Sequence, residues 1–301
     1  MGNEQYELNR LNHIPAKQPK TQNSYWNKWF GYAGRILVYA ILIVLFLIIA
    51  YPLFWMVINS LRDSDAILSN SWGLPNELMF QNYVTAWHTG IARYFVNSVI
   101  VTGFTCFLTV FISSLAAYAF SRFRFKGKNV LLIFCISGLM LAPQVSLVPL
   151  YQLMQSLNLY DTYWALIFPY VAYRIPFILL LIRSHFLSIP NEMVESAVLD
   201  GCTNFKVFTK IFIPLSKPVL MSATILTGYF AWNEFMFGIV FMSSNELKTV
   251  PAGLMQFQSA LQTDWGTLLA GLTISALPII LLFLFAQKYF IRGIGEGSLK
   301  G

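Results

Sequence analysis

The chain has 301 residues, of which 56% are hydrophobic and only 11% are charged. Soluble domains average about 25% charged residues, so this composition excludes an ordinary soluble domain and indicates a membrane protein. The formal net charge is +7. The Lys and Arg residues lie between apolar runs instead of clustering on a polar domain, which argues against nucleic-acid binding.

Six apolar segments are each long enough to cross a bilayer, which requires about 20 residues as a helix. They cover approximately residues 36–58, 95–119, 130–150, 163–182, 219–242 and 268–287. About 35 mostly polar residues precede the first segment, whereas a cleavable signal peptide has a short charged leader and a short apolar core. The sequence predicts an all-α membrane protein with tails over 1–35 and 291–301 and a six-helix domain over 36–290.

The distribution of Lys and Arg predicts the orientation of these helices. Sixteen lie in the two tails and in the second and fourth loops, and only three lie in the alternate loops. Positively charged loops face the cytoplasm. We therefore expect a multi-pass membrane protein with both termini and loop 188–217 in the cytoplasm.

Motifs for catalysis are not found in the sequence. No Gly-rich loop ending in Gly-Lys-Ser/Thr is present, so any use of ATP must come from a partner. The three histidines lack zinc-binding spacing, and no serine stands in a nucleophile elbow. We predict no enzyme site, no metal and no cofactor, and we interpret the three cysteines as reduced packing residues: Cys106, Cys135 and Cys202.

The polar loop 188–217 predicts two short helices joined at a glycine. Pro190 is suited to a helix start, and carboxylates in the following turns offset the positive end of the helix dipole. Gly201 is suited to ending the first helix because glycine adopts positive φ at no steric cost. Helical spacing predicts an inward face of Met193 with Ala197 and Val194 with Val198, and an outward face of Glu192, Glu195 and Leu199.

A second short helix is expected after Gly201, with Phe205, Phe208 and Phe212 on one stripe. Three phenylalanines on a cytoplasmic surface need a partner that buries them. The alternative is an amphipathic connector that lies on lipid headgroups.

At this point the residues resemble a known family. Glu195-x-Ala197, then Gly201, then nine residues to Ile211-x-x-Pro214, is similar to the cytoplasmic coupling loop of permease subunits of binding-protein-dependent ATP-binding cassette (ABC) importers. The resemblance extends over about 60–301, and its further motifs point to the carbohydrate branch, specifically the maltose-type second permease: AYAFSR at 117–122, PLY at 149–151, LYDT at 159–162, IPF at 175–177, WNEF at 232–235 and the glycine-containing tail at 295–301.

The resemblance implies a type I importer permease of the bacterial cell (inner or plasma) membrane. It would pair with a homologous permease and with two cytoplasmic ATPase subunits, which bind ATP and Mg. An extracellular solute-binding protein would deliver a sugar or oligosaccharide, or a non-sugar cargo such as glycerol phosphate. The sequence departs from the family pattern only at Ser196 and Ile213. The residues expected to couple to the ATPase are Glu192, Glu195, Ser196, Ala197, Asp200, Gly201, Phe205, Ile211 and Pro214.

Arg174 and Glu234 are the charged residues deepest in apparent spans, where each requires compensation. One interpretation places them along a polar translocation path, where aromatic rings and amides suit a sugar. The alternatives are that they pair with each other or with the partner permease, or that they lie nearer an interface. The candidate path residues are Tyr170, Arg174, Tyr229, Trp232, Asn233 and Glu234.

Two other classes of function fit the sequence less well. An ion-coupled secondary transporter should show inverted repeats or several intramembrane carboxylates, and the spans hold only Glu234. A secondary transporter would also leave the coupling-loop motif unexplained. For a membrane scaffold or an enzyme, the sequence contains no supporting constellation of residues. The sequence favours the importer permease over both.

Overall fold

The computed structural model describes residues 24–257 and 263–298, which are mostly helical. The chain divides into two units at Phe54 and Trp55. The first unit contains most of the long apolar helix α2 (Ser24–Asn59). The second unit begins with the last residues of α2 and contains every other described helix.

Four described helices are long and apolar enough to cross a membrane, and up to six spans result if each of two bent helix pairs counts as one. The four are α2, α5 (Ala92–Arg122), α8 (Tyr163–Ser188) and α15 (Trp265–Ser298). The expected segments 36–58, 95–119, 163–182 and 268–287 lie within these helices.

The expected segment 130–150 is bent instead of straight. Helix α6 (Lys128–Ser137) continues as a 3-10 turn to Met140, and the chain then bends by 93° into Pro143–Ser156, which contains α7 (Leu147–Ser156). Ala142 is extended, with φ −68° and ψ 129°. Pro143 explains this conformation, because a proline ring disfavours the helical region for the residue before it.

The expected segment 219–242 is also interrupted. Helix α12 (Lys217–Asn233) ends at Glu234, which is extended, and the short helix α13 (Met236–Phe241) begins two residues later. At its other end, α12 meets the segment Asn204–Leu215 at an angle of 77°. No proline or glycine lies at the Glu234 break, so we attribute the interruption of the helix to side-chain contacts.

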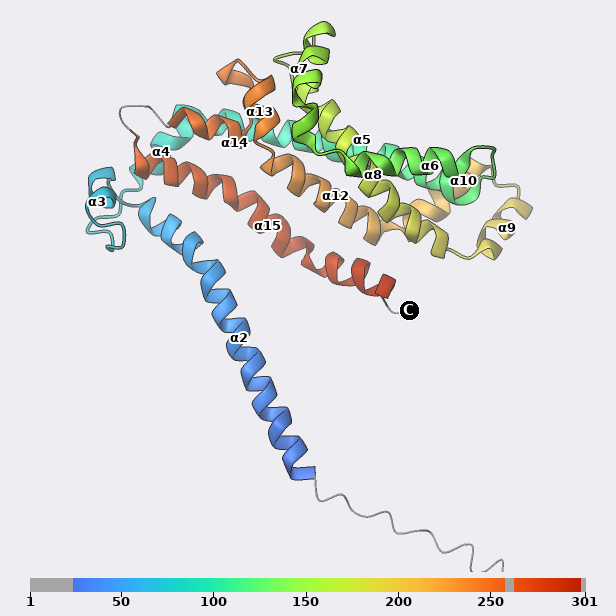
Figure 1. Ribbon diagram of the computed structural model, residues 1–301, viewed down its shortest axis with the longest axis horizontal. Helices are drawn as coiled ribbons and strands as arrows, with labels where there is room; N and C mark the ends of the chain where they lie inside the picture. The colour runs from blue at the N-terminus through green and yellow to red at the C-terminus, as the bar shows by residue number, and fades with distance from the viewer. Residues whose placement is uncertain (1–23, 258–262, 299–301) are drawn as a thin grey trace, which may run out of the picture. The chain divides into compact units, whose positions relative to one another are not determined.

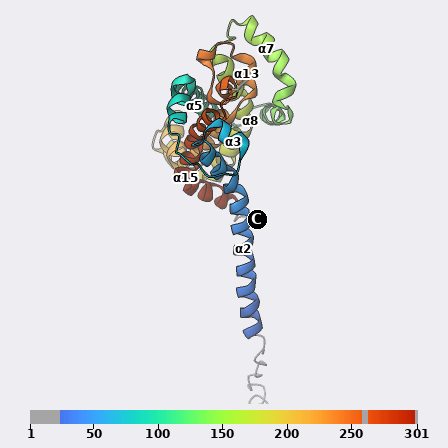
Figure 2. The same cartoon turned by 90° about the vertical axis from the view of Figure 1, so that its left-hand side faces the viewer.

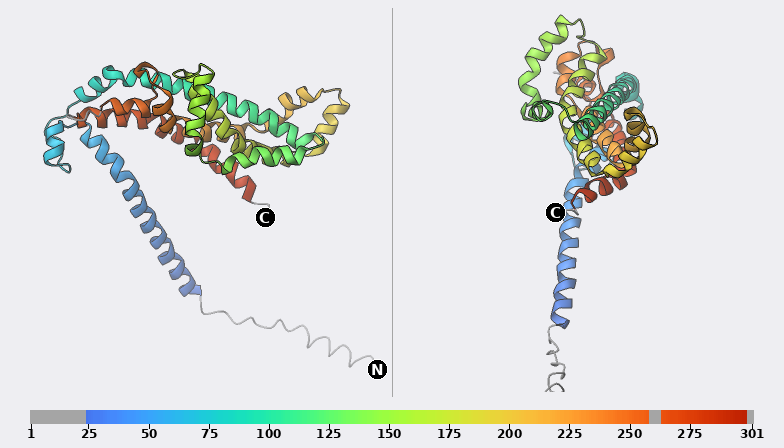
Figure 3. Two further views of the ribbon diagram at one scale, coloured as in Figure 1. Left: turned by 45° about the horizontal axis from the view of Figure 1, so that its top comes forward. Right: turned by 90° about the vertical axis from the view of Figure 1, so that its right-hand side faces the viewer.

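The short helices gather at opposite ends of the long ones. Helix α9 (Asn191–Leu199) and α10 (Asn204–Val207) lie at one end of α5 and α8, as Figures 1 and 3 show. At the other end lie α3 (Ser64–Ser69), α4 (Gln81–Ala86) and α14 (Val250–Gly253). Within the second unit, helices α7 and α13 lie to one side of α5 and α15 (Figure 2).

Helix α5 packs mainly against α8 and α12. Along it, Thr105, Thr109 and Ser113 follow at helical spacing, and each is fully buried. Their hydroxyl oxygens have no hydrogen-bond partner within the described chain. Hydrogen bonds between α5 and α8 lie instead near the helix ends, for example from Tyr163 Oη to Asn97 Oδ1 at 2.8 Å.

Candidate functional site

The first half of loop 188–217 forms the predicted helix and glycine turn. Helix α9 follows Pro190, and Gly201 has φ +76°. The amide of Cys202 donates to the carbonyl of Ala197 at 2.9 Å, and the amide of Gly201 donates to that of Val198 at 3.0 Å. This pair of bonds is the Schellman arrangement, in which a left-handed glycine satisfies the last carbonyls of a helix. The predicted end of the helix at Gly201 is confirmed, with the glycine at positive φ.

The inward face of α9 is narrower than predicted. Ala197 is buried and Val194 packs against the same apolar cluster. Met193 and Val198 are exposed, so their assignment to the inward face was wrong. Helix α9 lies across the end of the bundle and touches it along a single i, i+3 line. Leu199 is 88% exposed and belongs to the outward face, as predicted.

The second half of the loop departs from a regular helix. Thr203 caps α10 by accepting a hydrogen bond from the amide of Lys206 at 3.4 Å. A π-helical turn then spans Phe208–Phe212 and changes the helical spacing. Phe208 and Phe212 are buried, whereas Phe205 is 69% exposed. The predicted stripe of three phenylalanines is therefore wrong, because the bundle itself buries two of them.

Arg122, at the end of α5, anchors this loop. Its guanidinium donates to the carbonyls of Phe186 and Ile189 at 2.9 and 2.6 Å, and to the side chain of Asn191 at the start of α9. It also lies over the ring of Phe212, 4.8 Å from the centroid. One planar cation thus joins α5, the end of α8, the start of α9 and the π-helical turn.

Tyr118, one turn before Arg122, supports the other half of the loop. Its hydroxyl donates to the carbonyl of Asn204 at 3.2 Å. Its ring packs edge-on against Phe212, with centroids 4.9 Å apart. Both residues belong to the AYAFSR motif, but the sequence assigned them no role. Their position just before a charged loop is the one feature of the sequence that could have indicated a role. Their contacts with distant residues of α8 and of loop 188–217 follow only from the fold.

The residues predicted to couple to the ATPase divide by exposure. Ala197 is buried and Ile211 is half-buried. Ser196 donates its hydroxyl back to the carbonyl of Glu192 at 2.8 Å. The exposed members are Glu192, Glu195, Ser196, Asp200, Gly201, Phe205 and Pro214. Together with the exposed Leu199 of the outward face, they make up what we call the coupling surface.

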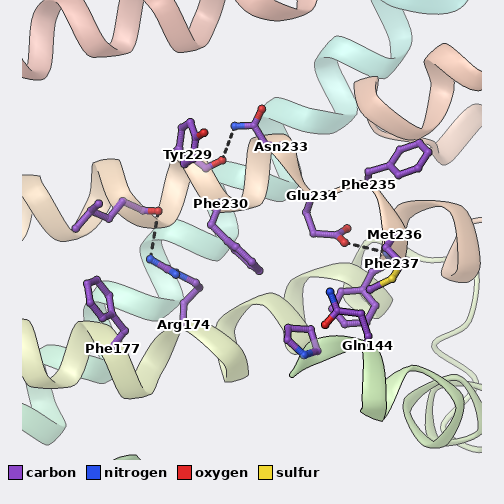
Figure 4. Close-up of a pocket in the computed structure, with 12 residues that line it drawn as sticks. Gln144, Arg174, Phe177, Tyr229, Phe230, Asn233, Glu234, Phe235, Met236 and Phe237 are labelled. Carbon is purple, nitrogen blue, oxygen red and sulfur yellow. Dashed lines mark hydrogen bonds between the residues drawn. The ribbon is translucent and has the colours of Figure 1, made fainter. Parts of the chain in front are cut away.

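A second candidate site is a cavity of about 620 Å³ beside the break between α12 and α13. Figure 4 shows the side chains that line it, which come from α8, α12, α13 and the turn at Pro143. Sequence reasoning identified four of them and missed the apolar majority. The lining residues are Pro143, Gln144, Arg174, Phe177, Leu226, Tyr229, Phe230, Asn233, Glu234, Phe235, Met236 and Phe237.

Glu234 holds the break in place. Its carboxylate accepts hydrogen bonds from the Tyr170 hydroxyl at 2.5 Å and from the amides of Phe237 and Gly238 at 3.0 and 3.3 Å. It therefore caps the start of α13, whose first amides have no partner within that helix. Tyr170 is fully buried and lies behind the carboxylate, so it does not line the cavity.

Arg174 lines the same cavity without an acidic partner. Among the described residues, no carboxylate lies within ion-pair distance of it, so it does not pair with Glu234. Its guanidinium lies over the rings of Phe177 and Phe230, at 5.3 and 5.0 Å from the centroids. Its one hydrogen bond, to the carbonyl of Leu226, is long at 3.4 Å. An arginine at mid-bilayer depth costs about 2.5–3.5 kcal/mol on insertion scales. The two ring contacts offset part of that cost, whereas the long hydrogen bond offsets little, and no opposite charge within the described residues neutralises the guanidinium.

The remaining path candidates lie in different places. Tyr229 and Asn233 line the cavity, and the Asn233 amide donates to the Tyr229 carbonyl at 2.8 Å. Trp232 faces away from it: its indole nitrogen donates to the Ser275 carbonyl of α15 at 3.1 Å, and its ring packs edge-on against Phe95. The structure thus brings four of the six candidates together and places Tyr170 and Trp232 in the surrounding core.

Comparisons with known proteins agree with this architecture. The model of the family "binding-protein-dependent transport system inner membrane component" matches residues 109–296. The probable ABC transporter permease YurM of Bacillus subtilis is 58% identical and covers 97% of each chain. The trehalose/maltose transport system permease MalG of Thermococcus litoralis is 36% identical over 89% of this chain and 97% of that protein.

Among solved structures, a bacterial ABC transporter that imports the acidic polysaccharide alginate matches with a TM-score of 0.75. It is 22% identical and covers 89% of this chain and 98% of that chain, a likeness that concerns the fold. The family predicted from the coupling-loop motif is confirmed. This chain is a multi-pass membrane protein that belongs to the inner-membrane components of binding-protein-dependent transport systems, the permease subunits of ABC importers.

Proposed function

We propose that this chain is the permease subunit of an ATP-driven importer for a sugar or oligosaccharide, and that partner ATPase subunits dock on its coupling surface. The cargo class is supported by relatives such as the trehalose/maltose permease. The observation that carries the docking is the coupling surface itself. Its carboxylates and two large apolar side chains, Leu199 and Phe205, remain exposed although the loop beneath them is firmly held.

In this proposal, the contacts of Arg122 and Tyr118 with loop 188–217 transmit a movement of the loop to the long helices. A push on α9 acts on Asn191 and Ile189, both held by Arg122, and so on the ends of α8 and α5 together. A push on α10 acts through the Asn204 carbonyl on Tyr118 of the same helix α5. In this proposal, closure of the ATPase dimer moves the coupling surface, and α5 and α8 move with it.

The proposal includes an orientation and a set of partners. Loop 188–217 faces the cytoplasm because four Lys and Arg residues accompany it, namely Arg183, Lys206, Lys210 and Lys217. The α3–α4 end then faces outward, toward the solute-binding protein. A homologous permease completes the translocation path, and ATP and Mg belong to the ATPase subunits.

Gly201 offers a sharp test of docking. No heavy atom lies within 4 Å of the position that a Cβ would take there, so a larger side chain meets no clash, although the φ of +76° strains the backbone of most residues other than glycine. Gly201→Glu is expected to leave the chain inserted and paired with its partner permease, while it abolishes copurification of the ATPase and ATP-dependent uptake. The matched control is Gly201→Asn, because asparagine tolerates positive φ and keeps the turn.

Uptake into proteoliposomes and copurification from membranes provide the measurements. Normal uptake by Gly201→Glu contradicts docking at this surface. Uptake by this chain without any ATPase, under an ion gradient alone, contradicts the importer reading as a whole.

A further inference from the structure

The two charged side chains that line the cavity differ in how they are satisfied. Glu234 accepts three hydrogen bonds from Tyr170 and from the amides of α13. Arg174 has one long bond to a carbonyl, and its Nε atom is buried without a partner within the described residues. The carboxylate of Glu234 therefore has its hydrogen-bond partners within the protein, whereas the guanidinium of Arg174 lacks most of its own.

The surroundings of Arg174 hold it toward the cavity. The rings of Phe177 and Phe230 lie on either hand, and the side chain reaches from α8 toward the backbone of α12 (Figure 4). An aromatic face attracts a cation without using its N–H groups as hydrogen-bond donors, so the two rings leave the donors of Arg174 unconsumed apart from the long bond of Nη2 to Leu226. A guanidinium presented in this way matches a carboxylate or a phosphate, which it binds through two parallel hydrogen bonds.

The same cavity holds neutral polar groups with unused capacity. The Gln144 side chain makes no hydrogen bond to any described residue, and the Asn233 side chain uses only its amide nitrogen. Amides together with aromatic rings suit a polyhydroxylated ring. The volume of about 620 Å³ lies within the range of small-molecule sites.

We propose that Arg174 binds an anionic group of the cargo, a carboxylate or a phosphate, and that the transported sugar is an acidic one. This inference rests on the proposed function and narrows its substrate class. A carboxylate from the partner permease would neutralise Arg174 but would leave the cavity and its amides unfilled. An acidic sugar satisfies the guanidinium, the Gln144 and Asn233 amides and the aromatic walls at once.

The test measures the reactivity of Arg174 in the assembled transporter. The complex of both permeases and the ATPase, in lipid nanodiscs, is treated with phenylglyoxal, which modifies free guanidinium groups, and modified peptides are quantified by mass spectrometry. The probes are galacturonate and glucose 6-phosphate, each matched with the neutral galactose or glucose. Acetate at equal concentration controls for ionic strength and for a bare carboxylate.

We expect Arg174 to be modified in the free complex and protected by an acidic probe, with labelling slowed about twofold when half of the sites are occupied. The neutral sugars and acetate should protect little. Arg124, which is exposed, serves as the internal reference and should be modified at one rate throughout. As a second readout, galacturonate should raise the melting temperature of the native complex, raise that of Arg174→Lys less and leave that of Arg174→Gln unchanged.

Three results would overturn the inference. Arg174 that resists modification without any probe is paired with a carboxylate of the partner permease. Equal protection by neutral and acidic sugars shows a hydroxyl-binding role. Absence of protection by both acidic probes removes the anion site. ATP hydrolysis stimulated by the solute-binding protein is measured on the same sample, so loss of the importer function itself is distinguished from loss of this site.

Discussion

The chain interrupts its helices at Gly201 and at Glu234 by opposite means. At Gly201 the backbone closes the turn with its own amides, and the surrounding space is empty. At Glu234 a carboxylate closes the break, supported by the buried hydroxyl of Tyr170. Water or a partner can satisfy polar groups at the end of a bundle, whereas a break among apolar helices must satisfy its own backbone. The turn at Gly201 is therefore accessible to a partner, whereas the polar groups at the Glu234 break are hydrogen-bonded within the chain.

The largest effect on stability is expected from removal of the Glu234 carboxylate. Glu234→Ala leaves the Tyr170 hydroxyl and two amides of α13 without a partner, which should destabilise the protein by about 2–4 kcal/mol. Glu234→Gln keeps an acceptor and should cost less. The measurement is thermal unfolding in detergent. Glu195→Ala, a change at an exposed carboxylate, is the control and should stay within about 0.5 kcal/mol; an equal loss in both variants would refute the capping role.

A smaller effect on stability, but a large one on coupling, is expected at Arg122. Arg122→Gln removes its bonds to the Phe186 and Ile189 carbonyls, which should cost about 1–3 kcal/mol. Uptake should fall more than ATPase binding does, because the coupling surface remains while its link to α5 is lost. Arg122→Lys keeps the charge without the planar fork and should recover only part of the uptake. Arg124→Gln, at an exposed arginine two residues away, should behave as the native protein.

The smallest expected effect is on how the stability of the protein depends on pH, through the carboxyl group of Asp161. Asp161 accepts bonds from the amides of Ser243 and Ser244, both at 3.0 Å, and so holds the chain just after α13. Burial raises the pKa of this carboxyl, but the hydrogen bonds from Ser244 and Ser243 outweigh it and leave the pKa below its ordinary value. Its stabilising contribution is therefore present above about pH 4 and disappears as the pH falls through the lowered value.

Asp161→Asn should remove that step from a stability–pH profile below about pH 4. Asparagine suits the site because Asp161 has φ +57°, a conformation it tolerates. A profile in which the variant loses stability on acidification as steeply as the native chain would contradict the role of this carboxyl.

The sequence predicted the helical class, the family and the turn at Gly201, because each depends on local composition or on a glycine with a specific conformation. The bend at Ala142 carried a signal in Pro143. The break at Glu234 carried a weaker one, a lone carboxylate in an apolar run, whose role as a helix cap depends on Tyr170, 64 residues earlier. The π-helical turn at Phe208–Phe212 had none, and it redirected the phenylalanines. Long-range contacts such as those of Arg122 required the fold.

The buried hydroxyls of α5 have a consequence for how the bundle changes shape. Thr105, Thr109 and Ser113 lie in its interior with no hydrogen bond across to described neighbours, while bonds such as Tyr163 to Asn97 fasten the ends. Turning the middle of α5 against α8 therefore breaks only van der Waals contacts, which are individually weak and can reform at a slightly different register. The contact between α5 and α8 therefore resists separation and sliding of the two helices at its ends, but it permits α5 to rotate about its own axis in the middle.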